Sequence, residues 1–336
     1  MIKEVIAKLV KGADLSQKEV ESAMEEIMTG GALPTQIASF LTAMRMKGET
    51  IDEIAGAASI MRKHATKIVT KHPYVLDTCG TGGDEAHTFN VSTVAAFVVA
   101  GAGIPVAKHG NRCVSSKCGS ADLLKAIGVN IEISPEKVSE CIDEVGIGFL
   151  FAPLLHKAMQ YAIGPRREIG IRTIFNILGP MTNPAGATHQ LLGVYNDELV
   201  EPIAKALGKL GSRHALVVHG LDGLDEVTTT DETSVSELKD GNVKNFKISP
   251  TDFGIKKTTL KALQGGEHDY NIKIMTNILN GIEGPQYDIV VLNAGCAIYA
   301  ADVAEDIGEG IELAKKSITS KSALKKLEQL KEFTNR

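Results

Sequence analysis

The sequence predicts an α/β fold in which a small all-helical N-terminal domain precedes a large α/β domain with a mainly parallel central sheet. Two observations carry this prediction: residues 1–68 show only helical patterns, and short strand-like and helical segments alternate from about residue 73. Such alternation is typical of parallel sheets, whose strands are joined by helical crossovers. We expect a helical domain over 1–70, completed by part of 160–185, and an α/β domain over 71–336.

The first 68 residues carry two helix-start signals of the capping-box type. Ser16 is followed three residues later by Glu19, and Thr50 is followed by Glu53 in the same spacing. In this motif the hydroxyl and the carboxylate each satisfy a free backbone N–H at the start of a helix. Glycines separate the apolar segments, and the apolar residues recur at helical spacing. The segment therefore predicts a bundle of about four helices.

The second part of the chain predicts strands, helices and one hairpin. The predicted strands are 74–78, 104–110, 129–133, 148–152, 191–195, 214–220 and 287–295. The predicted helices are 91–102, 119–127, 135–145 and a broken helical region over 303–333. Residues 233–248 alternate around Asp240-Gly241, which is a hairpin signal. The Pro- and Gly-containing segment 160–190 predicts helix plus loop, returning to the helical bundle.

Composition and charge exclude several classes of protein. The 336 residues are 43% hydrophobic and 23% charged, which is ordinary for a globular protein, and the net charge of −5 argues against a nucleic-acid binder. The five cysteines form no CxxC pair, which favours a reducing compartment over a disulfide framework or a zinc site. No signal peptide and no 18-residue apolar run is present, so we expect a cytoplasmic protein without a membrane partner.

A glycine-rich loop lies between the first predicted strand and the helix that follows it. In DTCGTGGDEAHTFNVST, Gly80, Gly82 and Gly83 follow the strand, and Asn90 or Ser92 can cap the helix. A helix N-terminus offers free N–H groups and partial positive charge, so this arrangement suits phosphate. It matches neither the Walker A nor the GxGxxG pattern. Alone, the stretch fits a phosphate site and a structural turn about equally well.

Two more predicted strands end in chemistry that fits a phosphate ligand. The second strand leads into KHGNRCVSSKCGSAD, where Lys108 and Arg112 supply cations. The strand 214–220 leads into LDGLDEVT, where Asp222, Asp225 and Glu226 are clustered carboxylates. Ligands of open parallel sheets bind beyond the carboxyl ends of the strands. The carboxylates suit Mg²⁺ bridging to substrate phosphates, although surface acids in a turn remain the alternative from the local sequence.

Taken together, these motifs resemble the anthranilate phosphoribosyltransferase family along essentially the whole chain. The matching segments are DTCGTGGD, FNVST, KHGNR-VSSK-GSAD, RREIGIRTIFNILGPMTNP and HGLDGLDEVT, in the family's order. The resemblance implies a helical domain joined to an α/β domain in a homodimer. It also implies transfer of the phosphoribosyl group of 5-phosphoribosyl 1-pyrophosphate to the amine of anthranilate, the second step of tryptophan biosynthesis from chorismate.

The resemblance carries over to individual residues of this sequence. Positions matching phosphoribosyl pyrophosphate contacts are Gly80, Gly83, Asp84, Thr88, Asn90, Val91, Ser92, Thr93, Lys108, His109, Gly110, Asn111, Arg112, Cys113, Val114, Ser115, Ser116 and Ser120. Positions matching anthranilate contacts are Gly80, Asn111 and Arg166, and those matching metal ligands are Ser92, Asp225 and Glu226. The implied cofactor is Mg²⁺, with two ions per active site. In HKAMQ, Lys157 replaces the family's usual proline, which leaves the path around His156-Lys157 open.

The chemistry of this reaction predicts no certain catalytic residue. Departure of pyrophosphate builds negative charge, which Lys108 and the metal would stabilise. The aryl amine is neutral at pH 7 and attacks without prior deprotonation, so no general base is obligatory. For His109, a proton role and a polar or structural role both remain open.

Two other readings compete with this one. A pyrimidine nucleoside phosphorylase shares similar segments, but such enzymes carry an additional C-terminal domain of about a hundred residues that this chain lacks. A nucleic-acid-binding relative would need a basic face, against which the net charge argues.

Overall fold

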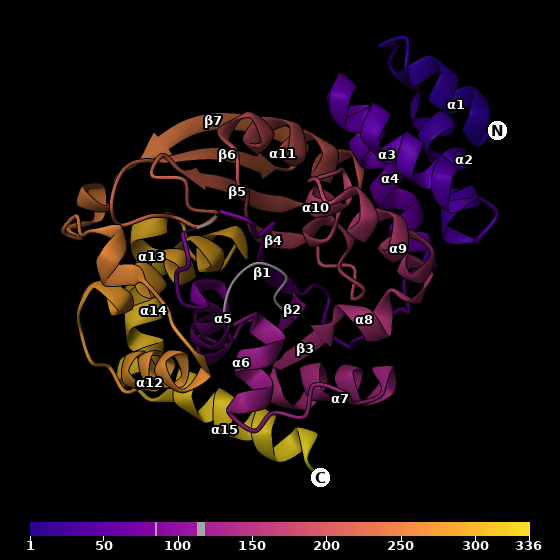
Figure 1. The fold of residues 1–336 in the computed structure, drawn as a ribbon. Helices are drawn as coiled ribbons and strands as arrows, with labels where there is room; N and C mark the ends of the chain where they lie inside the picture. Colours follow the sequence, from indigo (N-terminus) through magenta and orange to yellow (C-terminus); the bar gives the residue numbers. More distant parts are fainter. Residues whose placement is uncertain (85, 113–117) are drawn as a thin grey trace.

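The computed structural model describes residues 1–84, 86–112 and 118–336 and begins with a bundle of helices. These are α1 (Ile2–Leu9), α2 (Gln17–Met28), α3 (Pro34–Lys47) and α4 (Ile51–His64), drawn in indigo to purple in Figure 1. Both predicted capping boxes are present: the Ser16 N–H donates to Glu19 at 2.9 Å, and the Thr50 N–H donates to Glu53 at 2.8 Å. The all-helical start predicted from the sequence is confirmed.

A seven-stranded sheet forms the centre of the larger part, with the strand order β3-β2-β1-β4-β5-β6-β7. The strands are β1 (Leu76–Gly80), β2 (Val106–Gly110), β3 (Ile147–Phe151), β4 (His189–Gly193), β5 (His214–Gly220), β6 (Thr233–Lys239) and β7 (Asn242–Ile248). The pairs among β1–β5 are parallel, and β6 and β7 add an antiparallel hairpin. The hairpin turns at Asp240 and Gly241, both with positive φ, as the sequence predicts.

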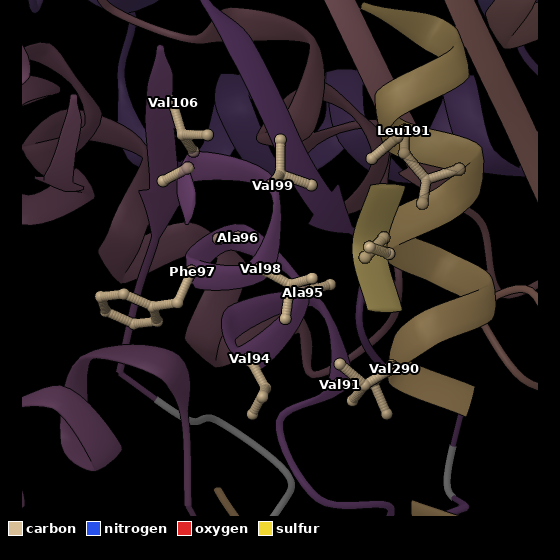
Figure 2. Packing of buried hydrophobic residues seen from close by; sticks show 14 of the residues in the cluster. Val91, Val94, Ala95, Ala96, Phe97, Val98, Val99, Val106, Leu191 and Val290 are labelled. Atoms are coloured by element: carbon tan, nitrogen blue, oxygen red, sulfur yellow. The ribbon is translucent and has the colours of Figure 1, made fainter. Parts of the chain in front are cut away.

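Helices cover both faces of the sheet. On one face α5 (Val91–Gly101) packs against α13 (Pro285–Ala300), and α14 (Ile307–Thr319) and α15 (Ser322–Thr334) lie behind α5. Figure 2 shows the apolar side chains of α5 meeting Val290 of α13 and strand residues such as Val106 and Leu191. On the other face lie α11 (Val200–Lys209) and α7 (Pro135–Val145), with α4 packed on α11. The mainly parallel α/β architecture is therefore confirmed.

The remaining helices are short or connect these layers. They are α6 (Ser120–Ala126), α8 (Ala152–Leu155), α9 (Gln160–Ile169), α10 (Phe175–Leu178) and α12 (His268–Leu279). Short 3-10 turns lie at Lys157–Met159, Pro180–Thr182, Asp197–Leu199, Pro250–Phe253 and Leu260–Leu263. The chain around His156 and Lys157 thus passes from α8 through one 3-10 turn into α9.

The segment after β3 returns to the helical bundle. Helix α9 packs on α2 and α3, and the Arg62 guanidinium of α4 donates to the carbonyls of Met181 at 2.7 Å and Leu210 at 2.9 Å. One apolar cluster runs from Phe40 of the bundle through Leu178 to Leu192 of the sheet. This packing agrees with helix plus loop over 160–190, and the domain boundary near residue 70 stays a prediction.

Two strand predictions are wrong. Residues 287–295 lie in α13, which begins at Pro285 and is buried along most of its length because both the sheet and α14 cover it. A short apolar run cannot by itself distinguish a buried strand from a buried helix. Residues 129–133 are an unpaired extended segment: Val129 and Ile131 are buried, but the Asn130 N–H donates to the Thr334 hydroxyl rather than to a strand.

Candidate active site

The ends of three parallel strands bring the predicted site segments together. The glycine loop follows β1, the Lys108 segment ends β2, and the Asp225-Glu226 pair follows β5. The Gly82 N–H donates to Asp225 Oδ2 at 2.7 Å, and the Ser92 N–H at the start of α5 donates to Glu226 Oε1 at 3.2 Å. The carboxylates therefore lie against both the loop and the helix N-terminus.

The glycines of the loop are required by its backbone and by close approach. Gly82 and Gly83 have φ of +68° and +79°, in the left-handed region that glycine adopts without a steric penalty. A Cβ on Gly80 would collide with the Asp225 carboxylate. Arg172 donates to the Gly83 carbonyl, and its guanidinium stacks on Tyr195 with 4.7 Å between the guanidinium carbon and the ring centroid. Arg172 therefore fixes the outer part of the loop.

Three carboxyl groups lie close to one another beside the loop. Burial raises the pKa of Asp225, and the neighbouring Asp84 raises it further. Burial and then Asp225 raise the pKa of Glu226 well above its ordinary value, and burial also raises the pKa of Asp84. A divalent cation between these groups would relieve both effects, so the donor set fits Mg²⁺.

The protein supplies only part of such a metal's coordination. Within the described residues, no three His, Cys, Asp or Glu side chains gather into a metal cage. Mg²⁺ usually keeps several waters and binds one or two carboxylates together with substrate phosphates, so an incomplete protein set is the expected one. Ser92 stands nearby, with its hydroxyl 3.4 Å from Lys108 Nζ.

Lys108 is a buried cation at the centre of this arrangement. Its side chain comes from β2, is 3% exposed, and donates to the Thr78 carbonyl of β1 as well as to Ser92 Oγ. Its positive charge counteracts the rise in the pKa of Glu226. A buried ammonium is expensive unless negative groups surround it, so its place here marks an anion-binding site.

A second buried carboxylate, Asp77, ties the ends of β1 and β2 together. Its oxygens accept from the His109 N–H at 3.1 Å and from Asn183 Nδ2 at 2.8 Å. Asn183 Nδ2 also donates to the Ala107 carbonyl at 2.8 Å. These bonds fix the backbone on either side of Lys108, a role for Asp77 and Asn183 that the sequence analysis missed.

His109 and His156 form a neutral buried pair. Their Nε2 atoms are 3.2 Å apart, so one ring donates to the other. Burial, then the positive charges of His156 and Lys108, lowers the pKa of His109 to about 3. Burial lowers the pKa of His156 to about 4. The sequence analysis missed this partnership because the two histidines are 47 residues apart and only the β2–β3 pairing brings them together.

Arg166 lies on α9 as a partly buried cation without a carboxylate partner among the described residues. Its guanidinium carbon is 5.1 Å from the centroid of the Phe175 ring. Burial lowers the pKa of Arg166, but a guanidinium stays protonated at neutral pH. An unpaired cation in a half-buried position is suited to an incoming anion.

Four other predicted contacts lie at the start of α5 or just before it. The side chains of Val91 and Thr93 are buried in the core, and their backbone N–H groups donate to the carbonyls of Phe89 at 2.7 Å and Asn90 at 3.1 Å, so their predicted substrate contacts stay proposals. Asn90 Nδ2 donates to the Cys118 carbonyl at 2.9 Å, and Thr88 pairs with Gln264 in an isolated bridge.

Residues after β2 lie at the rim of the site. The Ser120 hydroxyl donates to the Asn111 carbonyl at 3.3 Å, and a Cβ on Gly110 would collide with that hydroxyl. Arg112 is exposed and pairs with Glu132 at 3.2 Å, so its charge is already engaged. The predicted contacts Cys113, Val114, Ser115 and Ser116 lie outside the described residues.

Family models match most of the chain, and known proteins match it along nearly its whole length. Residues 3–65 match the helical bundle domain, and residues 72–324 the a/b domain, of a glycosyl transferase family. An anthranilate phosphoribosyltransferase of Pelotomaculum thermopropionicum is 54% identical, covering 99% of this chain and 97% of that protein. That of Thermus thermophilus has a crystal structure with a TM-score of 0.94 at 41% identity, covering 99% of each chain.

The yeast anthranilate phosphoribosyltransferase is similar in structure and has been solved with ligands. Its complex with PRPP and Mg has a TM-score of 0.91 at 30% identity, covering 99% of this chain and 98% of that one. The same yeast protein has also been solved with 4-fluoroanthranilate. Because full-length relatives exceed 50% identity and both family models match, this chain belongs to the anthranilate phosphoribosyltransferase family.

Proposed function

We propose that this chain transfers the phosphoribosyl group of phosphoribosyl pyrophosphate to the amine of anthranilate, giving N-(5-phosphoribosyl)anthranilate and pyrophosphate in tryptophan biosynthesis. The observation that carries the proposal is the meeting of the glycine loop, the N-terminus of α5 and Lys108 with Asp225 and Glu226. This combination of a helix N-terminus, a buried cation and paired carboxylates suits a metal-bound pyrophosphate. Full-length similarity to anthranilate phosphoribosyltransferases supports the same reaction.

Catalysis by this chain is mainly electrostatic and positional. Bond cleavage at C1 of the ribose leaves negative charge on pyrophosphate and positive charge on the sugar ring. Lys108 and the positive end of helix α5, where Ser92 lies, would stabilise the leaving group. Magnesium, when bound, supplies further positive charge to the pyrophosphate, and Ser92, Asp225 and Glu226 are the residues that would hold two ions.

The amine needs no strong base on the protein. An aryl amine is neutral at pH 7 and loses its proton after attack. A histidine whose pKa is about 3, as for His109, is a poor general base near neutral pH. We therefore assign His109 and His156 a polar, orienting role, and we assign Arg166 to the anthranilate carboxylate, which its forked donors match. The remaining predicted contacts, Asn111 with anthranilate included, stay proposals on the basis of the resemblance.

Assembly and compartment are part of the same proposal. We expect a homodimer, supported by the resemblance and by exposed apolar side chains on the bundle such as Val10, Leu33 and Met46. Sedimentation would test it. No helix of the described residues is long and apolar enough to cross a membrane. The buried thiols Cys79, Cys141 and Cys296 suit a reducing compartment, and we propose the cytoplasm.

One assay tests the reaction directly. Anthranilate fluorescence should fall when phosphoribosyl pyrophosphate and Mg²⁺ are added together, and should remain constant when either is omitted. A chain that instead cleaves pyrimidine nucleosides with phosphate would contradict the proposal.

A second experiment tests the metal ligands. The double variant Asp225→Ala/Glu226→Ala should nearly abolish turnover at millimolar Mg²⁺ while remaining folded by circular dichroism. Normal turnover with unchanged Mg²⁺ dependence would remove the metal role from both residues.

A further inference from the structure

The loop that carries Asp225 and Glu226 is held by polar side chains that the reaction itself does not use. It begins after β5 and ends at β6, so it spans residues 221–232. Backbone bonds close it at its base, where the Leu221 N–H donates to the Glu232 carbonyl at 2.9 Å. A second backbone bond, from the Gly220 N–H to the Leu224 carbonyl at 2.8 Å, ends one residue before Asp225. Two adjacent carboxylates that repel one another need a rigid backbone beneath them, so the side-chain bonds on both sides of the pair matter.

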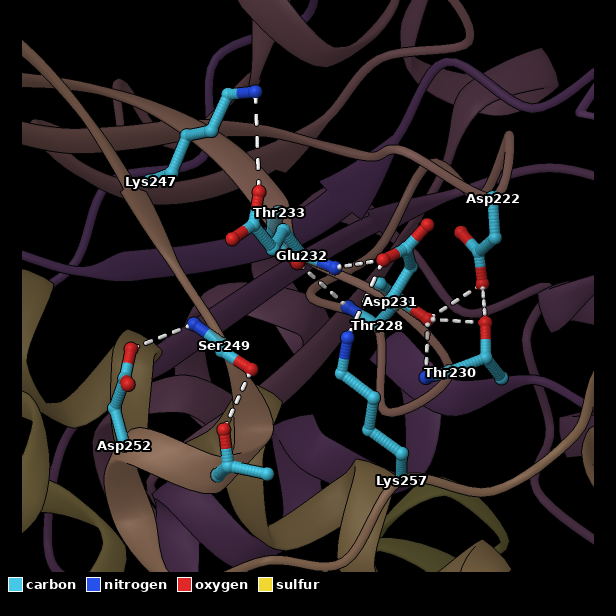
Figure 3. A network of polar contacts seen from close by, with 11 residues as sticks. Asp222, Thr228, Thr230, Asp231, Glu232, Thr233, Lys247, Ser249, Asp252 and Lys257 are labelled. Carbon is cyan, nitrogen blue, oxygen red and sulfur yellow. Dashed lines mark hydrogen bonds and ion pairs between the residues drawn. The ribbon is translucent and has the colours of Figure 1, made fainter.

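Asp222 ties the two sides of this loop together. Its Oδ2 accepts from the hydroxyl of Thr228 at 2.6 Å and from that of Thr230, and its Oδ1 accepts from the Leu224 N–H at 3.2 Å. Figure 3 shows the Asp222 carboxylate pointing toward Thr228 and Thr230. A Cβ on Gly220 would lie 2.5 Å from Asp222 Oδ1, so the strand end is shaped around this carboxylate.

Asn293 holds the residue next to Glu226 from the other side. It lies on α13, is fully buried, and is surrounded in the helix by apolar residues. Its Oδ1 accepts from the Val227 N–H at 2.9 Å, and its Nδ2 donates to the Val227 carbonyl at 2.8 Å. A second Nδ2 bond reaches the Ile289 carbonyl at 2.8 Å. A buried amide is costly unless it is hydrogen-bonded, and two of the three hydrogen bonds of Asn293 go to the loop 221–232.

We propose that Asn293 and Asp222 are positioning residues for the metal carboxylates. Together they hold the backbone at Leu224 and Val227 and the side chain of Thr228, on both sides of the Asp225-Glu226 pair. The two carboxylates are then presented toward the glycine loop and α5 with little freedom to turn away. Groups that orient metal ligands typically contribute 10- to 100-fold to metal affinity or activity. The inference rests on the proposed metal role of Asp225 and Glu226.

Mn²⁺ binding gives a readout that does not depend on turnover. The free Mn²⁺ signal in electron paramagnetic resonance is titrated with the full-length protein and phosphoribosyl pyrophosphate. Asn293→Leu and Asp222→Asn should each weaken Mn²⁺ binding about tenfold or more. In the activity assay the half-saturating Mg²⁺ concentration should rise by a similar factor, while kcat at saturating Mg²⁺ changes less.

Ser317→Ala is the matched control. Ser317 is also buried, and its hydroxyl donates to the Val98 carbonyl at 2.7 Å, toward the end of α5 that lies away from Ser92. The Ser317→Ala variant should lose thermal stability without any change in its affinity for Mn²⁺. If Asn293→Leu does not fold, Asp222→Asn and the milder Thr230→Val carry the test, with a smaller effect expected for Thr230→Val.

The outcomes separate this inference from the proposed function. If Asp225→Ala/Glu226→Ala weakens Mn²⁺ binding but Asn293→Leu and Asp222→Asn do not, the positioning role is overturned while the metal ligands stand. If Ser317→Ala weakens Mn²⁺ binding as much as the two test variants, their effect is general destabilisation and the inference is likewise overturned. If the double alanine variant leaves Mn²⁺ binding intact, both the metal assignment and the inference fail.

Discussion

Replacing Arg166 tests how this chain recognises the carboxylate of its aromatic substrate. A carboxylate beside the amine is what distinguishes anthranilate from plain aniline, and Arg166 is a half-buried cation with no carboxylate partner among the described residues. A charge-assisted hydrogen bond contributes about 1.5–3 kcal/mol. Arg166→Ala should therefore raise the KM for anthranilate about 10- to 100-fold.

The cost of this substitution in folding free energy should be smaller than its cost in binding. In the described structure, the contact of Arg166 is with the face of Phe175, at 5.1 Å, and such a cation–π contact is worth about 0.5–1 kcal/mol at a partly exposed site. The denaturation midpoint should accordingly change little. Arg167→Ala is a close control, because Arg167 is the exposed neighbour on the same helix.

Steady-state kinetics followed by anthranilate fluorescence decide between the outcomes. The KM for phosphoribosyl pyrophosphate should stay within about threefold, since its phosphates are assigned to the glycine loop and β2 rather than to α9. An analogue that lacks the carboxylate should be used equally poorly by the wild type and by Arg166→Ala. The reasoning is refuted if the penalty falls on phosphoribosyl pyrophosphate, or if Arg167→Ala shows the same rise.

Three further predictions follow from the site and the surface. The pKa of His109 is about 3 and that of His156 about 4, and both lie below the unfolded value near 6.5. The contribution of the two neutral rings to the free energy of unfolding is therefore complete above about pH 6.5 and is lost as the pH falls. Urea denaturation from pH 7 to 4.5 should show the free energy of unfolding falling by about 1.4 kcal/mol per pH unit for each histidine. In His156→Gln the free energy of unfolding should fall less steeply with pH, and an equal dependence on pH in both proteins would contradict the neutral pair. Gly80→Ala places a Cβ against Asp225 and should raise the Mg²⁺ requirement, whereas Gly164→Ala, with open space around it, should behave as wild type in the same titration. The net charge of −5 predicts no retention on heparin at low salt, and tight retention would reopen the nucleic-acid alternative.

The sequence was most informative where local rules determine structure. The capping boxes at Ser16 and Thr50 and the turn at Asp240-Gly241 depend on neighbouring residues only, and all three are present. The expectation that the site segments lie beyond the carboxyl ends of strands follows from the general behaviour of parallel sheets. The resemblance then supplied residue roles that no local pattern could.

The sequence was least informative where contacts between distant segments determine the local structure. The apolar run containing Asn293 predicts a strand, and only its burial between the sheet and α14 explains a helix of 16 residues. The same error concealed the contact of Asn293 with Val227. The buried hydrogen bond between Asp77 and Asn183, which are 106 residues apart, leaves no periodic signal in the sequence.

The apolar cluster that continues from the helical bundle into one face of the sheet limits how this chain can be divided. Ile174, Leu178 and Met181 pack with bundle residues in the same cluster as Leu207 and Leu192. A truncation that begins at β1 would leave these side chains on an open apolar surface, and expression of that fragment alone should yield aggregates. A chimaera that takes its first 65 residues from a relative should fold only when residues 160–182 come from the same relative. The bundle and the segment that returns to it thus behave as one structural unit.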